Sequence, residues 1–385
     1  MGHVSGPLHG VRIVTMGGLG PGPFCGMLLG DLGADVVRID MPGAVDGPLP
    51  IDYTVRRSQR SLALNIKDPQ GRDLLLRLIE GADAFVEVFR PGVAERLGIG
   101  PDDLLERNPR LVYARMTGYG QDGPYADRAG HDINYIALAG ALHGIGTADA
   151  PVPPLNLVGD YGGGGMLLAV GLLSAILDAR TSGRGQVVDV AMVDGAAALM
   201  APYYGMVAAG TWRDRRRANV LDGAAHYYGV YRTADGEHVA VGAMEPQFYA
   251  ELCARLGLNV ADVPQDADEP TAWAAHRDVM AARFRERTRA EWERELSSPG
   301  CCVTPVLNLA EAPRHPHNVA RSTFIEIDGV VQPAPAPRFS RTAPQTPTSP
   351  ALPGDHTRDV LAACGLGDDE IAGLLDSGVA RQSSD

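Results

Sequence analysis

The stretch that decides the fold is residues 11–40, VRIVTMGGLGPGPFCGMLLGDLGADVVRID. It begins with a short β-rich run at 11–15, passes through the turn-rich segment GGLGPGP and continues into an apolar helical segment near 24–32. Residues 35–39 form a second β-rich run. A strand, a turn, a helix and a second strand in this order predict a β-α-β unit.

The same alternation continues along the chain as far as residue 116. Strands are expected at 61–65, 84–88 and 111–116, with helices at 69–80 and near 93–97. The helix at 69–80 has Asp68 as its N-cap and Pro69 at its first position. This repeated pattern predicts an α/β fold with a parallel, helix-covered sheet.

Beyond Gly118 the sequence changes character. Long apolar helical segments are expected at 133–143, 166–180 and 192–208. Such helices lie in a large core or at an oligomer interface. Residues 227–241 alternate like a β-hairpin with an Asp-Gly turn, and open a smaller α+β region that runs to about Val306. A length of 385 residues agrees with two domains.

The end of the chain returns as an extended segment. Seven prolines in residues 332–354 exclude a helix and predict a connection across the surface, after which residues 355–379 are helical.

Composition excludes several classes of protein. A formal net charge of −13 opposes a broad nucleic-acid-binding surface, which needs clustered Lys and Arg. The N-terminus lacks the pattern of a secretory signal, and the most apolar helical stretch, 166–177, is about half the ~20 residues of a membrane span. Five cysteines without C-x-x-C spacing favour a reducing cytoplasm, and we expect no metal site.

The glycine-rich turn after the first strand raises the question of a dinucleotide cofactor. The segment GGLGPGP and Asp40 at the end of the second strand occupy positions that nicotinamide-binding folds use. The G-x-G-x-x-G pattern fails, however, because its third glycine would fall on Pro23 or Cys25. A tight turn into a helix is the preferred interpretation.

Three segments carry candidate catalytic side chains. His131 precedes an apolar helical run in GHDINYIALAG, Asp160 precedes four glycines in NLVGDYGGGGM, and Glu245 follows a strand in VAVGAMEPQFY. Taken alone, each could be a helix cap or a helix-start residue. Four successive glycines are entropically costly, so close approach of another group to the backbone, or unusual dihedral angles, is expected at 162–165.

Together these segments resemble the family III CoA-transferase superfamily and, within it, the α-methylacyl-CoA racemases. The resemblance spans nearly the whole chain. It rests on the order of GPLHGVRIV, GDLGADVVRID, FRPGV, ARMTGYGQDGP, GHDINYIALAG, PPLNLVGDYGGGGM, GRGQVVDVAMVDG, GAMEPQFY, CVTPV, PAPRFSRT and LPGDHTRDVL.

The resemblance implies inversion of the carbon next to a thioester carbonyl in 2-methylacyl-CoA substrates. It places the two bases on His131 and Asp160, with Glu245 orienting the His131 ring and stabilising its imidazolium form. Asp160 can donate a proton only if burial or a neighbouring charge raises its pKa, and we expect such a shift. No cofactor is implied, because coenzyme A is part of the substrate.

The resemblance also implies contacts to coenzyme A, and Asp132 is expected to tune the same region. The implied residues are Leu64, Asn65, Ile66, Lys67, Val88, Phe89, Arg90, Arg96, Gly130, Asp132, Ile133, Asn134 and Tyr135, with Arg57 and Arg60 as reserve cations. Relatives commonly carry a basic residue where this chain has Met41.

At the level of architecture, the resemblance implies a Rossmann-like large domain of residues 1–220 plus 332–385 and a smaller α+β domain of residues 221–331. The two subunits of a homodimer would interlock, with Glu245 of one near His131 and Asp160 of the other. The same fold also serves CoA-transferases, in which Asp160 would attack the thioester, and a non-catalytic acyl-CoA-binding protein is the third hypothesis.

Overall fold

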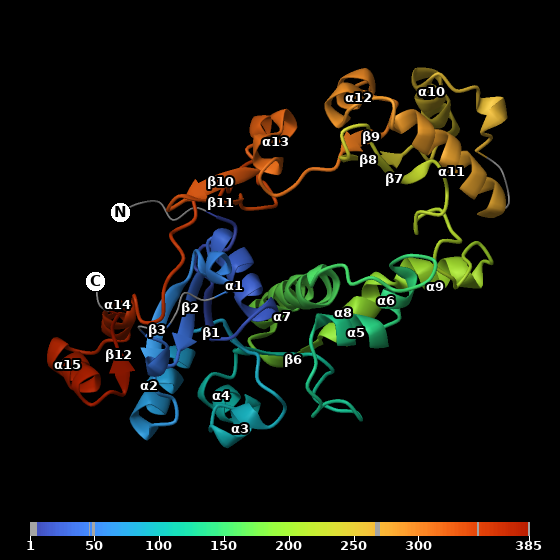
Figure 1. Cartoon of the computed structure of the whole chain (residues 1–385). Coiled ribbons are helices and arrows are strands. Elements are labelled where there is room, and N and C mark those ends of the chain that lie inside the picture. The colour runs from blue at the N-terminus through green and yellow to red at the C-terminus, as the bar shows by residue number, and fades with distance from the viewer. Residues whose placement is uncertain (1–5, 46, 48–50, 266–269, 345, 384–385) are drawn as a thin grey trace. The chain divides into compact units, whose positions relative to one another are not determined.

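The computed structural model describes residues 6–45, 47, 51–265, 270–344 and 346–383 (Figure 1). Contacts between residues divide the chain into two compact units. The larger unit comprises Met1–Ala139, Pro154–Leu199 and Ser322–Asp385, and the smaller comprises Gly140–Pro153 and Met200–Arg321. The domains expected from the sequence, 1–220 with 332–385 and 221–331, stay a prediction.

A seven-stranded sheet forms the centre of the larger unit, in the order β12-β3-β2-β1-β4-β5-β6. The strands are β1 (Arg12–Met16), β2 (Asp35–Asp40), β3 (Arg60–Leu64), β4 (Ala84–Glu87), β5 (Val112–Thr117), β6 (Gln186–Ala191) and β12 (Ala380–Arg381). All neighbours pair in parallel except β12, which is antiparallel to β3. The predicted parallel α/β sheet is therefore confirmed.

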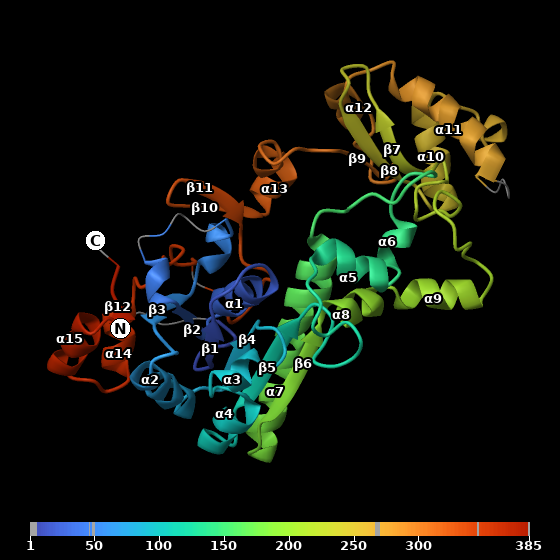
Figure 2. The ribbon, with the colours of Figure 1, turned by 60° about the horizontal axis from the view of Figure 1, so that its bottom comes forward.

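Helices cover both faces of this sheet (Figure 2). They are α1 (Pro21–Asp31), α2 (Pro69–Glu80), α3 (Val93–Arg96), α4 (Pro101–Arg107), α7 (Leu167–Ser182), α14 (Thr357–Ala363) and α15 (Asp368–Asp376). Successive strand residues point to opposite faces. Ile13 packs in the core with α1 and α7, whereas Val14 packs in the core with α2, α14 and α15. Burial on both faces explains the continuous apolar runs of the strands.

Helix α2 follows its sequence prediction closely. It has the predicted bounds, and the Asp68 carboxylate accepts a hydrogen bond from the Gln70 N–H at 2.8 Å. The predicted helix at 133–143 is instead two helices, α5 (Asp132–Leu138) and α6 (Ala141–Gly144), because Gly140 has a left-handed φ of 84° between them. The segment 192–208 likewise divides into α8 (Met192–Leu199) and α9 (Ala201–Ala208).

The glycine-rich segment after Asn156 is a π-helix, Leu157–Met166, which runs directly into α7. The glycines allow this segment to contact its neighbours closely, as the sequence predicts. A Cβ at Gly163 would lie 2.6 Å from the backbone nitrogen of Ala196 on α8, and one at Gly165 would lie 2.7 Å from the Phe24 ring on α1. The glycine-rich segment is therefore a helix packed closely against α8 and α1.

This continuity lengthens the apolar helix beyond the sequence-based estimate. Among the described residues, one helical stretch, Leu157–Ser182, has the length of a membrane span, with a mean hydropathy of 1.6. Half of its most apolar window is buried inside the protein. A core helix has the same length and composition, so this stretch is weak evidence for a membrane.

Two buried arginines hold the returning chain against the larger unit. This segment follows a hairpin of β10 (Phe324–Ile327) and β11 (Val330–Pro333). The Arg57 guanidinium pairs with Asp31 at 2.7 Å and donates to the Pro333 carbonyl at 2.8 Å. Arg38 donates to the Ala351 carbonyl at 2.9 Å. Both arginines are almost completely buried, so these contacts fix the path of the chain toward α14.

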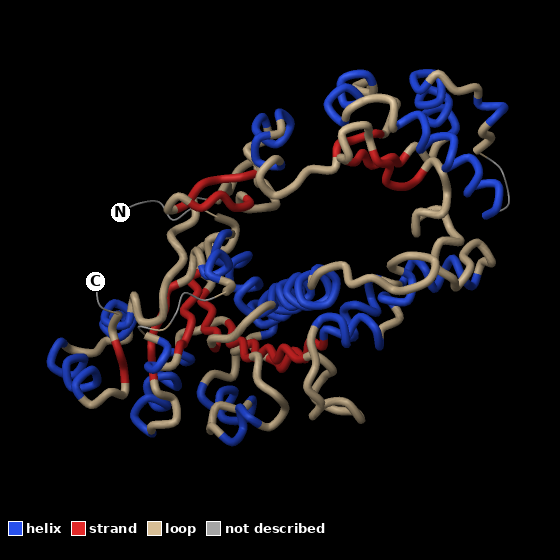
Figure 3. Tube along the Cα trace, viewed as in Figure 1, coloured by secondary structure: helices blue, strands red, loops and turns tan. Residues whose placement is uncertain are grey.

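The smaller unit has a core of its own, and Figure 3 shows its strands and helices. An antiparallel sheet of β7 (Tyr228–Arg232), β8 (His238–Gly242) and β9 (Val303–Pro305) packs with α10 (Pro246–Leu256), α11 (Pro270–Phe284) and α12 (Arg289–Glu295), and α13 (Pro316–Ala320) follows. The predicted hairpin is confirmed, with Gly236 at φ 85° in its turn.

Candidate active site

The strand order places a ligand-binding crevice between β1 and β4. The chain builds the sheet outward from β1 on one side and from β4 on the other, so the loops after these strands diverge. Ligands of open α/β sheets bind at the carboxyl ends of the strands at such a point. A cavity of about 1080 Å³ lies there, lined by residues 17–21 after β1, 88–91 after β4, and 117–119, 126 and 128–131 after β5.

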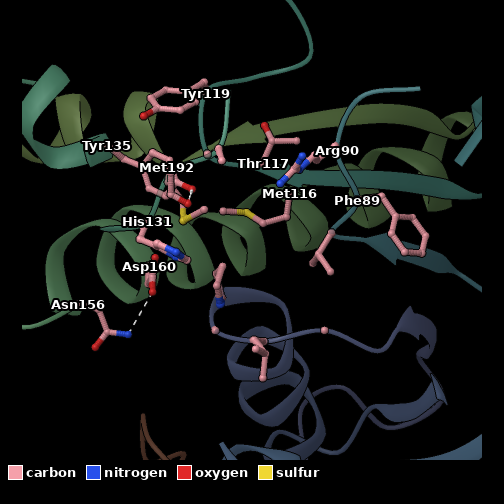
Figure 4. A pocket seen from close by; sticks show the side chains of 18 of the residues that line it. Phe89, Arg90, Met116, Thr117, Tyr119, His131, Tyr135, Asn156, Asp160 and Met192 are labelled. Carbon is pink, nitrogen blue, oxygen red and sulfur yellow. Dashed lines mark hydrogen bonds between the residues drawn. The ribbon is translucent and has the colours of Figure 1, made fainter. Parts of the chain in front are cut away.

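His131 lies in this cavity at the start of α5. It is the N-cap residue, with extended backbone angles, and its N–H donates to the Asn134 Oδ1 at 3.0 Å. The ring itself is not used for capping and remains exposed toward the cavity. Figure 4 shows it beside Asp160.

Asp160 faces the same cavity from the π-helix. Burial raises the pKa of its carboxyl above the ordinary value, and the negative charge of Asp132 raises it further. A hydrogen bond from the Asn156 amide at 3.1 Å and the charge of His131 act in the opposite direction (Figure 4). The net shift is upward, as the sequence analysis expects for a carboxyl that donates a proton.

Asn156 is absent from the sequence-based candidates, although it lines the cavity and contacts Asp160 directly. It lies four residues before Asp160, the spacing at which side chains on one helical face meet. This spacing was the signal that could have identified it.

A buried carboxylate supports the loop after β4. Glu87 is fully buried, accepts the Phe89 N–H at 2.6 Å and pairs with Arg115 at 3.1 Å. Burial raises the pKa of Glu87 despite these contacts. The bond to the Phe89 N–H fixes the turn that presents Val88, Phe89 and Arg90 to the cavity.

Aromatic side chains form the wall around the loop that follows β5. The Tyr135 ring packs edge-on against Tyr119 at a centroid distance of 4.9 Å, and its hydroxyl donates to the Gly130 carbonyl. Burial raises the Tyr135 pKa to about 12, so the hydroxyl stays protonated. Arg128, which the sequence analysis missed, lines the cavity and stacks on Tyr125, with its guanidinium carbon 3.9 Å from the ring centroid.

The structure gathers part of the sequence-based set in the cavity. The lining includes His131, Asp160, Val88, Phe89, Arg90, Gly130 and Tyr135, whereas Leu64, Asn65, Ile66, Lys67, Arg96, Asp132, Ile133 and Asn134 do not line it. Leu64 and Ile66 are buried in the core against α2, and Lys67 is exposed after β3. Roles for these residues stay predictions.

Arg57 and Arg60 do not line the cavity, and their role as reserve cations stays a prediction. Arg57 is buried against Asp31, and Arg60 pairs with Asp35 at 2.7 Å, so both charges already have partners. Glu245 belongs to the smaller unit, where it is exposed at the N-cap of α10 and makes no side-chain cap bond. Among the described residues, no cluster of three or more His, Cys, Asp or Glu side chains could hold a metal ion.

Fold and cavity together define an α/β protein with a histidine and a carboxyl of raised pKa in a cavity at the switch point of its sheet. The chain belongs to the family described as CoA-transferase family III, whose sequence pattern matches residues 8–357.

Among its relatives, the "Alpha-methylacyl-CoA racemase" of Mus musculus is 45% identical over 372 residues, covering 95% of this chain and 96% of that protein. That of Homo sapiens is 43% identical over 371 residues, covering 94% and 95%. A solved structure, a CAIB/BAIF family protein from Brucella suis, superposes with a TM-score of 0.79 at 25% identity and covers 94% of this chain and 100% of its own.

Proposed function

We propose that this protein is a racemase that inverts the α-carbon of 2-methylacyl-CoA thioesters. The observation that carries the proposal is the meeting of His131 and Asp160 in one cavity, in a chain 45% identical to a protein named for this reaction. The raised pKa of Asp160 suits a group that donates a proton in one direction and accepts it in the other.

The side chains of His131 and Asp160 account for proton transfer in both directions. Neutral His131 removes the α-proton from one face, and the electrons of the broken C–H bond move into the thioester to form an enolate. Protonated Asp160 then donates its proton to the opposite face of the same carbon, leaving an imidazolium and a carboxylate. In the reverse direction the carboxylate is the base and the imidazolium is the acid.

The enolate oxygen needs hydrogen-bond donors or positive charge beside it. Helix α5 begins directly after His131, so the partial positive charge at the start of this helix is our candidate for this role.

Coenzyme A needs cations for its phosphates and apolar surface for its other parts. Arg90 and Arg128 are the arginines that line the cavity in the described chain, and Arg128 is our candidate for the cation missing at Met41. Met116 and Met192 supply an apolar, adaptable wall for the acyl chain. No cofactor besides the coenzyme A of the substrate is proposed.

We further propose that the active unit is a homodimer in the cytoplasm, in line with the five free cysteines. One face of the helix from Met166 along α7 leaves Met166, Val170 and Leu177 more than half exposed. Large exposed apolar surfaces of this kind mark protein interfaces. In the dimer, Glu245 of one subunit would complete the site of the other.

Subunit mixing tests the shared site. Homodimers of His131→Ala and of Glu245→Gln are expected to be inactive, whereas exchanging their subunits should restore activity, because half of the sites in each heterodimer then contain both side chains. No recovery, with heterodimers verified by mass, would contradict the shared site. Val170→Glu with Leu177→Glu should yield monomers in a sedimentation experiment.

The reaction itself is tested in D2O with one enantiomer of a 2-methylacyl-CoA. We expect deuterium at the α-carbon together with loss of optical purity. Acyl exchange onto a free acid without α-exchange would instead indicate a CoA-transferase with Asp160 as its nucleophile. Tight binding of the thioester with neither reaction would indicate a binding protein.

A further inference from the structure

Asp132 is a buried carboxylate beside both bases, and its side chain does not enter the cavity. It follows His131 directly in the sequence and is the first residue of α5. Its Oδ2 accepts the backbone N–H of Gly159 at 2.7 Å and that of Asp160 at 2.8 Å. The side chain therefore connects the element that carries one base to the backbone of the other.

The two hydrogen bonds of Asp132 join segments that are close in space but far apart in sequence. The two acceptor bonds span 27 and 28 residues, and they bind the first turn of the π-helix to the first turn of α5. N–H groups in a first helical turn lack partners within the helix, so a carboxylate is a suitable acceptor for them.

Two further features indicate that the contact is specific. A Cβ at residue 159 would lie 2.6 Å from the Asp132 Oδ2, so only glycine allows the carboxylate to come this close. Among the described residues, the other oxygen of Asp132 is buried and has no hydrogen-bond partner. Burying a carboxylate with one oxygen unpaired costs free energy. The two hydrogen bonds that the Asp132 Oδ2 accepts offset part of this cost.

We propose that Asp132 is a positioning residue that fixes the Asp160 carboxyl relative to the His131 ring, so that the two bases face opposite sides of one carbon. The inference rests on the proposed racemase function. Proton transfer depends steeply on the placement of the reacting groups, and a displacement of about 1 Å can cost about 10²-fold in rate. Losing this contact should therefore impair Asp160 more than His131, whose own N–H is held by Asn134.

The test measures α-deuterium exchange in D2O separately for each enantiomer, at early times when little of that enantiomer has been converted. Each enantiomer presents its proton to one base, so each exchange begins with proton removal by a different base. Asp132→Ala should lower the exchange assigned to Asp160 at least about tenfold relative to that assigned to His131. Gly159→Ala, which displaces the same carboxylate from the other side, should give the same asymmetry.

Two controls separate positioning from general damage. Asp132→Asn retains an oxygen that can accept both N–H groups, and should keep the ratio of the two exchange rates within about threefold of wild type. Asp103→Ala removes a carboxylate that accepts the Gly100 N–H at 3.0 Å outside the cavity lining, and should leave the ratio unchanged. Binding of coenzyme A to each variant, measured by calorimetry, reports whether the cavity is intact.

The outcomes are separable. Equal loss of both exchanges in Asp132→Ala, or an unchanged ratio in a folded Gly159→Ala, would overturn the positioning role. If Asp132→Ala does not fold, the ratio in Gly159→Ala decides alone. Absence of α-exchange in the wild type would contradict the proposed function itself, before any variant is compared.

Discussion

Removing the amide of Asn156 should change the protonation of Asp160 in a defined direction. The Asn156 Nδ2 donates to the Asp160 Oδ2 at 3.1 Å and so favours the ionised carboxylate. Bonds to charged groups contribute about 1.5–3 kcal/mol when well buried, and this half-exposed pair should contribute about 1 kcal/mol. At fixed pH, Asn156→Ala should therefore raise the ratio of protonated to ionised Asp160 about fivefold.

The assay is the pH dependence of kcat/KM measured with each enantiomer. In both directions the reaction starts from a site in which His131 and Asp160 share one transferable proton, so the profiles for the two enantiomers should coincide. With either enantiomer, the variant should need a higher pH to reach half of its maximal rate. Burial and Asp132 also raise the Asp160 pKa, while His131 lowers it, and these groups are unchanged in the variant.

Asn108→Ala is the matched control, because the Asn108 amide donates only to the Ile79 and Ala82 carbonyls in the described structure, outside the cavity lining. It should lower stability without moving either pH profile. A shift of the Asn156→Ala profile toward lower pH, or an equal shift in the control, would refute this account of Asp160.

The remaining predictions concern stability and are measured by chemical denaturation. Gly195→Ala should destabilise the protein by about 1–3 kcal/mol, because the new Cβ would lie 1.8 Å from the Gly163 carbonyl oxygen. Gly373→Ala in α15 should stabilise the protein by about 0.5–1 kcal/mol, because nothing lies within 4 Å of the new Cβ. Arg57→Ala should cost about 3–5 kcal/mol because it leaves Asp31 buried and unpaired, but Arg60→Ala removes a partly exposed pair and should cost at most about 1 kcal/mol. Burial lowers the pKa of His226 from 6.5 to about 4 in the folded protein, and the charges of His276 and Arg277 contribute to this shift. Between these two pH values, His226 is therefore protonated in the unfolded chain and neutral in the folded one. Stability should then fall by about 1.4 kcal/mol per pH unit as the pH drops through this window, and His226→Gln should flatten that dependence; a variant as pH-sensitive as wild type would contradict this.

Local signals in the sequence were sufficient for much of the larger unit. The strands alternating with helices and the cap at Asp68 depend on residues close in sequence, as does the turn at Gly236 in the smaller unit. Strand β6 escaped prediction because its apolar residues continue without a break into α8, and no turn residue separates the two elements.

The candidate site could be predicted only in part, because its shape depends on contacts between segments that are distant in sequence. His131 and Asp160 could be proposed from their segments and from the family resemblance, but the π-helix arises from packing against α1 and α8, which no local pattern contains. The bonds from Asp132 to residues 159 and 160 likewise join distant segments. The role of Glu245 stays a prediction, since it depends on a second subunit.

The most direct test of the two-base account compares His131→Ala and Asp160→Asn in D2O with each enantiomer of a 2-methylacyl-CoA. Each variant should lose inversion yet still exchange the α-proton of the one enantiomer that faces its remaining base, with retained configuration. The two variants should favour opposite enantiomers. Loss of exchange for the same enantiomer in both, or inversion at the wild-type rate in either, would contradict the assignment of His131 and Asp160 as the bases on opposite faces.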